Sequence, residues 1–180
     1  SACNLDCTYC FYLSKQSLPG GPGGGHMSEE ILESFIRDYI ESVTADEVVF
    51  SWQGGEPTLM GLGFFEKVVA LQTKHAKPGQ RIENDLQTNG TLLDDDWARF
   101  LKARNFLGGL SIDGPREIHD HYRITKRGEP TFDAVCNAAH TLRRFGVRYN
   151  TLTCVHRFNA SRPLDVYRFV RDTLGARYLQ

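Results

Sequence analysis

The sequence shows no excess of either charge. Its 21 Lys and Arg residues balance 22 Asp and Glu residues, so the formal net charge of the 180 residues is -1. Proteins that bind nucleic acid or anionic membranes carry basic patches that this balance does not indicate, so we expect neither partner. The sequence also lacks an apolar run long enough to span a membrane, and we expect no secretory signal before its first cysteines.

Cysteine is scarce, and its spacing argues against two common uses. The five cysteines cannot all pair, because five is an odd number. Disulfide frameworks are also typical of small secreted domains, whereas this chain has 41% hydrophobic residues and an ordinary core. A structural zinc site usually needs a second cysteine pair. Cys136 and Cys154 stand alone, and we interpret both as buried thiols. Free thiols predict a reducing compartment, most simply the cytoplasm.

The other three cysteines lie close together near the start of the chain. Cys3, Cys7 and Cys10 have the spacing C-x3-C-x2-C, with Tyr9 directly before the third. A tight loop of this kind can turn three thiolates onto one metal centre, and soft sulfur ligands suit iron–sulfur clusters, zinc or Cu(I). In a [4Fe–4S] cluster, three cysteines leave one iron open to a small molecule. The motif resembles that of the radical SAM enzymes, named for S-adenosylmethionine (SAM).

Hydrophobic periodicity predicts strands that alternate with helices. Helices are expected from Ser28, as N-cap, to about Val43, with an apolar stripe packed in the core, and over 62–75, 94–104, 131–145 and 163–174. Strands are expected over 47–52, 81–87, 106–112 and 147–155, and a further strand begins at 178. The glycine-rich segment 19–25 predicts a flexible loop, since the Lys-Ser/Thr of a phosphate-binding loop does not follow it.

This alternation predicts an α/β fold of parallel βαβ units, either an open doubly wound sheet or a partial barrel. Each strand ends in a polar or glycine-rich segment, which favours a barrel with its chemistry at the carboxyl ends of the strands. The resemblance implies a partial (β/α)6 radical SAM barrel that is truncated at both ends. Residues 1–180 would then be one radical SAM core domain, without its first strand and without a C-terminal SPASM domain.

A second motif, Gly54-Gly55-Glu56-Pro57, follows the strand at 47–52. Two glycines let the backbone approach a ligand closely, and Pro57 ends the hydrogen bonding of the strand. Free carbonyls and the Glu56 carboxylate there could hold an ammonium group, although an ordinary βα turn would look the same. Radical SAM enzymes carry a Gly-Gly-Glu-Pro motif at this place, and in that family it binds the amino group of SAM.

Further segments narrow the resemblance to the anaerobic sulfatase-maturating enzymes, radical SAM proteins of the SPASM/twitch group. The segments are Ser51 to Leu59, Gln87-Thr88-Asn89-Gly90, Leu110 to Pro115, Ile118-His119-Asp120, Tyr122-Arg123 and Pro130 to Asp133. The resemblance implies that Tyr9 contacts the adenine, Gly55 and Ser111 bind SAM, Arg123 meets the SAM carboxylate, and Gln53 lies near the substrate peptide.

The residue chemistry leaves alternatives at each polar position. Arg123 offers a planar fork of donors that suits a carboxylate, but could form a surface ion pair. Ser111 could donate to a ligand or cap its strand. Asp113 could bond ribose hydroxyls or cap the turn that follows it. Asn89 and Asn150 point toward the same rim as weak candidates. We interpret His119, His121 and His156 as solvated residues rather than catalytic ones.

The resemblance implies an enzyme that oxidises a Cys or Ser of a sulfatase precursor to Cα-formylglycine. It would use a [4Fe–4S] cluster on the three cysteines, SAM, and a reductant such as flavodoxin or ferredoxin. The proton acceptor and the auxiliary clusters are expected beyond Gln180. One alternative is another SPASM-type enzyme that forms thioether or carbon–carbon crosslinks in peptides. The other is a non-catalytic iron–sulfur or zinc module, which would not need Gly54–Glu56, Ser111 and Arg123.

Overall fold

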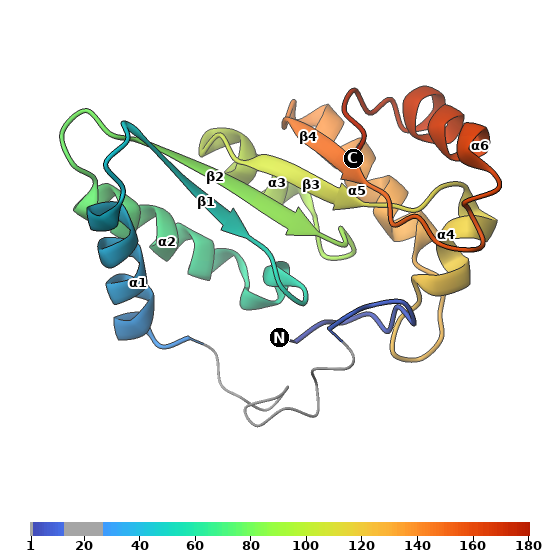
Figure 1. Ribbon diagram of the computed structural model, residues 1–180, viewed down its shortest axis with the longest axis horizontal. Coiled ribbons are helices and arrows are strands. Elements are labelled where there is room, and N and C mark those ends of the chain that lie inside the picture. The colour runs from blue at the N-terminus through green and yellow to red at the C-terminus, as the bar shows by residue number, and fades with distance from the viewer. Residues whose placement is uncertain (1, 13–26) are drawn as a thin grey trace.

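The computed structural model describes residues 2–12 and 27–180. Its centre is a parallel sheet with the strand order β1-β2-β3-β4, covered by helices on one face (Figure 1). The strands are β1 Glu47–Trp52, β2 Arg81–Thr88, β3 Leu107–Ser111 and β4 Tyr149–Leu152. The helices are α1 Glu29–Ser42, η2 Pro57–Met60, α2 Leu62–His75, α3 Asp95–Ala103, α4 Arg116–Tyr122, α5 Phe132–Arg144, α6 Pro163–Arg168 and η3 Phe169–Thr173. The predicted α/β fold with successive parallel strands is confirmed.

Helices α2, α3 and α5 form the crossovers that parallel pairing requires, and they bury the main core. Phe65 of α2 packs edge-to-face on Trp97 of α3, with ring centroids 5.5 Å apart. Leu110 of β3 and Leu142 of α5 are also fully buried in this cluster. The core therefore occupies the helix-covered face of the sheet, and the opposite face carries both polar residues and exposed apolar ones such as Leu107.

The predicted start of α1 is confirmed, whereas only part of its apolar stripe is buried. Ser28 caps the helix by accepting a hydrogen bond from the Ile31 backbone N–H at 3.3 Å. Leu32 and Ile36 are buried, but Ile31 and Phe35 are 59% and 44% exposed. The expectation that the whole stripe packs in the core is therefore wrong, because one line of it lies along the edge strand β1, where Phe35 contacts Phe50 but stays open to solvent.

The segments after β3 and β4 differ most from the prediction. Helix α4 has only seven residues, too few to give a periodic signal, and β4 ends at Leu152 instead of Val155. The last three residues lie beside β4 as a single parallel bridge between Thr151 and Leu179. Thr131 does not cap α5 with its side chain: the Asp120 carboxylate accepts the first free N–H groups of that helix instead.

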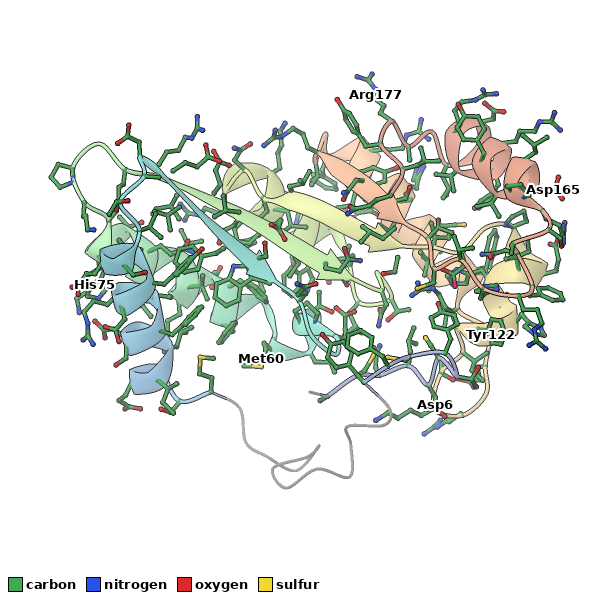
Figure 2. All side chains as sticks on the ribbon, viewed as in Figure 1. Asp6, Met60, His75, Tyr122, Asp165 and Arg177 are labelled. Carbon is green, nitrogen blue, oxygen red and sulfur yellow. The ribbon has the colours of Figure 1, made fainter. Side chains whose placement is uncertain are left out.

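The N-terminal segment lies across the carboxyl ends of the strands (Figure 1). The Glu56 backbone N–H donates to the Ala2 carbonyl at 2.8 Å, and the Asp6 N–H donates to the Ile124 carbonyl at 2.9 Å. Figure 2 labels Asp6 on this segment and Tyr122 on α4, and the Tyr9 ring of the segment packs edge-to-face on Tyr122 with centroids 5.5 Å apart. These contacts hold the cysteine segment at the edge of the sheet where the strands end. Segment 19–25, predicted to be a loop, lies outside the described residues.

Among the helices of the described residues, none combines the length and the apolarity that crossing a membrane requires.

Candidate cofactor site

A cavity of about 480 Å³ opens between the N-terminal segment and the ends of the strands. It brings together residues from seven separate parts of the sequence, as the topology of a parallel sheet predicts. Of the residues singled out as site candidates, the cavity is lined by Cys3, Cys7, Tyr9, Cys10, Gln53, Gly54, Gly55, Glu56, Ser111 and Arg123. Asp113 is absent from this lining.

The three cysteines of the N-terminal segment are half-buried free thiols in the wall of the cavity. A turn closed by the bond from the Cys10 N–H to the Cys7 carbonyl, 2.8 Å, brings two of them together. Burial raises the pKa of Cys7 to about 12 and also raises that of Cys3. Metal ligation needs thiolates, so loading this site must release protons.

Within residues 2–12 and 27–180, no group of three or more His, Cys, Asp or Glu side chains is arranged to hold a metal ion. The donor set suits a [4Fe–4S] cluster, in which each of three cysteines binds a different iron. Three free thiols on one cavity wall therefore fit the group that the motif implies.

Cys154 is exposed at the same cavity and Cys136 is half-buried, so the interpretation of both as buried thiols is wrong.

Glu56 is 4% exposed, and its carboxylate is fully engaged by the protein. Its Oε1 accepts from the Thr58 N–H at 3.1 Å, the Thr58 hydroxyl at 2.6 Å and the Thr88 hydroxyl at 2.7 Å. Its Oε2 accepts from the Asn89 N–H at 2.7 Å. The carboxylate thus fixes the turn after β1 to the end of β2, and the predicted direct bond to an ammonium group would have to compete with these four donors.

The two glycines before Glu56 present backbone to the cavity. Gly54 has a φ of 132°, a conformation that favours glycine because it has no Cβ. At this corner a ligand can therefore meet backbone atoms directly, while Glu56 holds the turn in place.

Asp113 and Arg123 form a buried ion pair rather than the surface pair weighed as an alternative. The Arg123 side chain is 9% exposed and that of Asp113 is fully buried. Arg123 Nη2 donates to Asp113 Oδ1 at 3.0 Å, and Nε lies 2.9 Å from Oδ2 without an aligned hydrogen bond. Burial opposes the charge of Arg123, but Asp113 more than offsets it and raises the pKa. Arg123 therefore stays charged at the cavity wall.

Ser111 is held by a residue that sequence reasoning did not single out as a site residue. Gln87 Nε2 donates to Ser111 Oγ at 2.9 Å, and both side chains line the cavity. A Cβ at Gly109 would lie 2.2 Å from Gln87 Oε1, so the glycine leaves the space that Gln87 occupies. The feature of the sequence that could have identified Gln87 is the segment Gln87–Gly90, which supports the resemblance to the family.

Asn89 and Asn150, both expected at the rim, have different surroundings. Asn89 lines the main cavity and donates to the Asn4 side chain at 2.8 Å, which fixes the cysteine segment. Asn150 lines a neighbouring cavity of about 290 Å³ on the open face of the sheet and bonds Gln180 at 3.2 Å.

Two of the three histidines are not solvated as expected. His119 is fully buried: its Nδ1 accepts from the Asp113 N–H at 3.4 Å, and its Nε2 lies 3.1 Å from the Thr131 hydroxyl. Burial lowers the pKa of His119 to about 4, so it is neutral at pH 7. The His156 side chain is 9% exposed and lies 3.7 Å from Asp113 Oδ2. His119 therefore supports the backbone behind the ion pair.

Three thiols, a glycine-lined turn and a buried arginine around one cavity, at the strand ends of a parallel α/β sheet, define a radical SAM site. Residues 1–170 match the family described as the Radical SAM superfamily, and the chain belongs to this superfamily of enzymes. Its members use a [4Fe–4S] cluster and SAM, which confirms the predicted cofactors.

Within the superfamily, the chain is similar to anaerobic sulfatase-maturating enzymes. It is 44% identical over 180 residues to the serine-type enzyme of Bacteroides thetaiotaomicron, covering 100% of this chain and 43% of that protein. It is 44% identical over 173 residues to the cysteine-type enzyme of Clostridium perfringens, covering 96% of this chain and 46% of that protein. The chain thus spans less than half the length of these relatives, and the two types are equally similar to it.

Solved structures agree with the sequence comparison. Native anSMEcpe with bound AdoMet and Kp18Cys peptide superposes with a TM-score of 0.91 at 43% identity, over 100% of this chain and 48% of that chain. Streptococcus suis SuiB bound to precursor peptide SuiA gives a TM-score of 0.68 at 13% identity, which shows the fold alone.

Proposed function

We propose that residues 1–180 are the radical SAM core domain of a longer anaerobic sulfatase-maturating enzyme. The whole enzyme would oxidise a Cys or Ser of a sulfatase precursor to Cα-formylglycine, with electrons from a reductant such as flavodoxin or ferredoxin in the cytoplasm. The observation that carries the proposal is the cavity shared by the three thiols, the Gly54–Glu56 turn, Ser111 and Arg123. Relatives at 44% identity, both named as sulfatase-maturating enzymes, support it.

In this proposal Cys3, Cys7 and Cys10 hold the cluster, and the rest of the cavity orients SAM. When bound, the cluster and SAM would supply the radical chemistry for removing a hydrogen from the Cβ of the substrate residue. Arg123 meets the SAM carboxylate with its free edge, because Asp113 occupies the other.

The remaining cavity residues complete the pocket for SAM and the peptide. Backbone groups at Gly54 and Gly55 meet the amino group, Ser111 donates to SAM, and the Tyr9 ring contacts the adenine. Gln53 lies at the junction of the two cavities, because it lines both. We propose that the substrate peptide reaches the site there.

Anaerobic reconstitution with iron and sulfide tests the cluster. We expect four irons per chain, lost in Cys7→Ala, because each cysteine ligates a separate iron. Cys136→Ala is the matched control, since this half-buried thiol lies on α5 outside the cavity, and it should keep all four irons. Stoichiometric zinc without iron-dependent absorbance would contradict the proposal.

A peptide deuterated at the Cβ of its target Cys or Ser tests the substrate. We expect SAM cleavage by residues 1–180 with dithionite to transfer deuterium into 5′-deoxyadenosine, as measured by mass spectrometry. Formylglycine should form more slowly than deoxyadenosine, because the proposal places the proton acceptor and auxiliary clusters outside these residues. If deoxyadenosine formed without deuterium for every sulfatase peptide, the sulfatase precursor would be refuted as the substrate. The assignment of residues 1–180 as a radical SAM domain would still hold.

A further inference from the structure

Asp113 joins three segments that are far apart in the sequence. The Tyr9 hydroxyl donates to its Oδ2 at 2.5 Å from the cysteine segment. Arg123 Nη2 donates to its Oδ1 at 3.0 Å from the end of α4. The Cys154 N–H donates to the same Oδ1 at 3.1 Å from the loop after β4. All three donors meet one carboxylate that is completely buried.

The carboxylate itself does not reach the cavity, whereas two of its partners do. Tyr9 and Arg123 line the cavity, and Asp113 lies behind them. Its oxygens already accept from three donors and face the Arg123 guanidinium, so a ribose hydroxyl would have to displace one of these contacts. The alternative in which Asp113 caps its own turn also fails to explain bonds to a residue 104 positions away.

We propose that Asp113 is a positioning residue that fixes Tyr9 and Arg123, and through them the bound SAM, by tying the cysteine segment to the end of β3. This inference rests on the proposed function, because it takes SAM as the ligand of the cavity. A bond to a buried, ionised acceptor is strong and directional, so it sets the orientation of the Tyr9 ring.

The surroundings of the Tyr9 ring make the hydroxyl bond decisive for its orientation. The ring packs edge-to-face on Tyr122 at 5.5 Å, and the Arg123 guanidinium lies 5.6 Å from its centroid. Ring contacts alone tolerate sliding and tilting, whereas the hydroxyl bond fixes one geometry. Loss of that bond should therefore loosen the adenine contact without removing any thiol.

Tyr9→Phe in the reconstituted chain is the first test, because it deletes only the hydroxyl. We expect SAM binding to weaken about tenfold while four irons remain bound, as one hydrogen bond to a charged group predicts. Tyr122→Phe is the matched control: it deletes a phenol hydroxyl from the neighbouring ring, outside the cavity lining, and should leave SAM affinity unchanged. The electron paramagnetic resonance signal of the reduced cluster should respond to SAM less sharply in Tyr9→Phe than in Tyr122→Phe.

Asp113→Asn and a ribose-modified ligand separate positioning from direct contact. If Asp113 acts through Tyr9, the double variant Tyr9→Phe/Asp113→Asn should bind SAM about as weakly as Asp113→Asn alone. The 2′-deoxy and 3′-deoxy analogues of SAM should then lose the same factor in affinity in wild type and in Asp113→Asn.

Three results would overturn the inference: unchanged SAM affinity in Tyr9→Phe, fully additive effects in the double variant, or a ribose hydroxyl whose deletion matters only when Asp113 is present. If Asp113→Asn fails to fold, Tyr9→Phe against Tyr122→Phe still decides the matter. Absence of SAM binding in the wild type would instead refute the proposed function.

Discussion

Two buried carboxylates hold the two sides of the cavity, and they are stabilised in different ways. Glu56, after β1, accepts hydrogen bonds from backbone and hydroxyl donors only, and no ion pair to it occurs among residues 2–12 and 27–180. Asp113, after β3, pairs with the buried Arg123. Both residues hold the N-terminal segment, Glu56 through its backbone N–H to the Ala2 carbonyl and Asp113 through its carboxylate to the Tyr9 hydroxyl.

The difference gives the cavity two ends of unlike charge. At the Glu56 end neutral donors occupy the carboxylate, so a positive group such as an ammonium would meet the backbone of Gly54 and Gly55 and would compete with those donors for Glu56. At the other end Arg123 presents a positive charge beside the neutralising Asp113, which suits a carboxylate. SAM carries both groups on its methionine part, and the proposed orientation places its carboxylate at Arg123 and its amino group at Gly54 and Gly55.

The largest effect is expected from removing the ion-paired acid. Asp113→Ala leaves Arg123 as an uncompensated buried charge, so we expect a loss of about 3–5 kcal/mol in the free energy of unfolding. Denaturant unfolding monitored by tryptophan fluorescence measures it. Asp133→Ala is the matched control, because Asp133 pairs with Arg116 on the exposed surface and should leave the midpoint unchanged. If Asp113→Ala lost little free energy of unfolding, the ion-paired carboxylate would matter no more than the carboxylate of Glu56, which neutral donors surround.

Lowering the pH should reduce the free energy of unfolding through His119, which lies behind Asp113. The pKa of His119 is about 4 in the folded chain, against about 6.5 when unfolded. Between these values the unfolded chain binds a proton that the folded chain does not, so stability should fall as the pH drops from about 6.5 to about 4. The shift corresponds to roughly 3 kcal/mol.

A His119→Gln variant supplies the control for this pH dependence. Glutamine does not titrate, so the variant should lose that share of the pH dependence while the carboxylates still contribute theirs. Denaturant midpoints measured across this pH range for both proteins make the comparison. Parallel curves for wild type and His119→Gln would show that His119 does not titrate with folding.

A smaller loss is expected when Glu56 becomes Gln. The amide replaces one acceptor oxygen by a donor, which leaves one of its four partners without a bond, at a cost of about 1–3 kcal/mol. No buried counter-charge is stranded, so the effect should stay below that of Asp113→Ala. Glu66→Gln, at an exposed position of α2, is the control for the loss of charge and should not change the midpoint. If Glu56→Gln were as damaging as Asp113→Ala, dispersed and paired charges would be equivalent here.

Most of the architecture could be predicted from the sequence because it follows from local periodicity. Strands and helices appear close to their predicted bounds wherever one face of the element is buried, as in α3 with its Asp94 cap. The exceptions have local causes: α4 is too short to show a period, and residues 153–155 leave the sheet after β4 although their composition suits a strand. Burial of α1 was overestimated because a stripe at helical spacing does not say how much of it meets the sheet.

The sequence by itself determined the class of site, because three cysteines at fixed spacing and two glycines before Glu56 are constraints of neighbouring residues. It also indicated Ser111 and Arg123 as residues of the same strand-end region. Only the tertiary structure decided how the acids are used: Glu56 is saturated by Thr58, Thr88 and Asn89, and Asp113 lies behind the cavity wall.

The physical reason is that a carboxylate's role depends on which donors surround it. Those donors come from segments up to 104 residues away, which no local pattern specifies. Spacing along the chain fixes which residues can reach a cluster, whereas burial and pairing, set by the packed fold, fix which side chains remain available to a ligand.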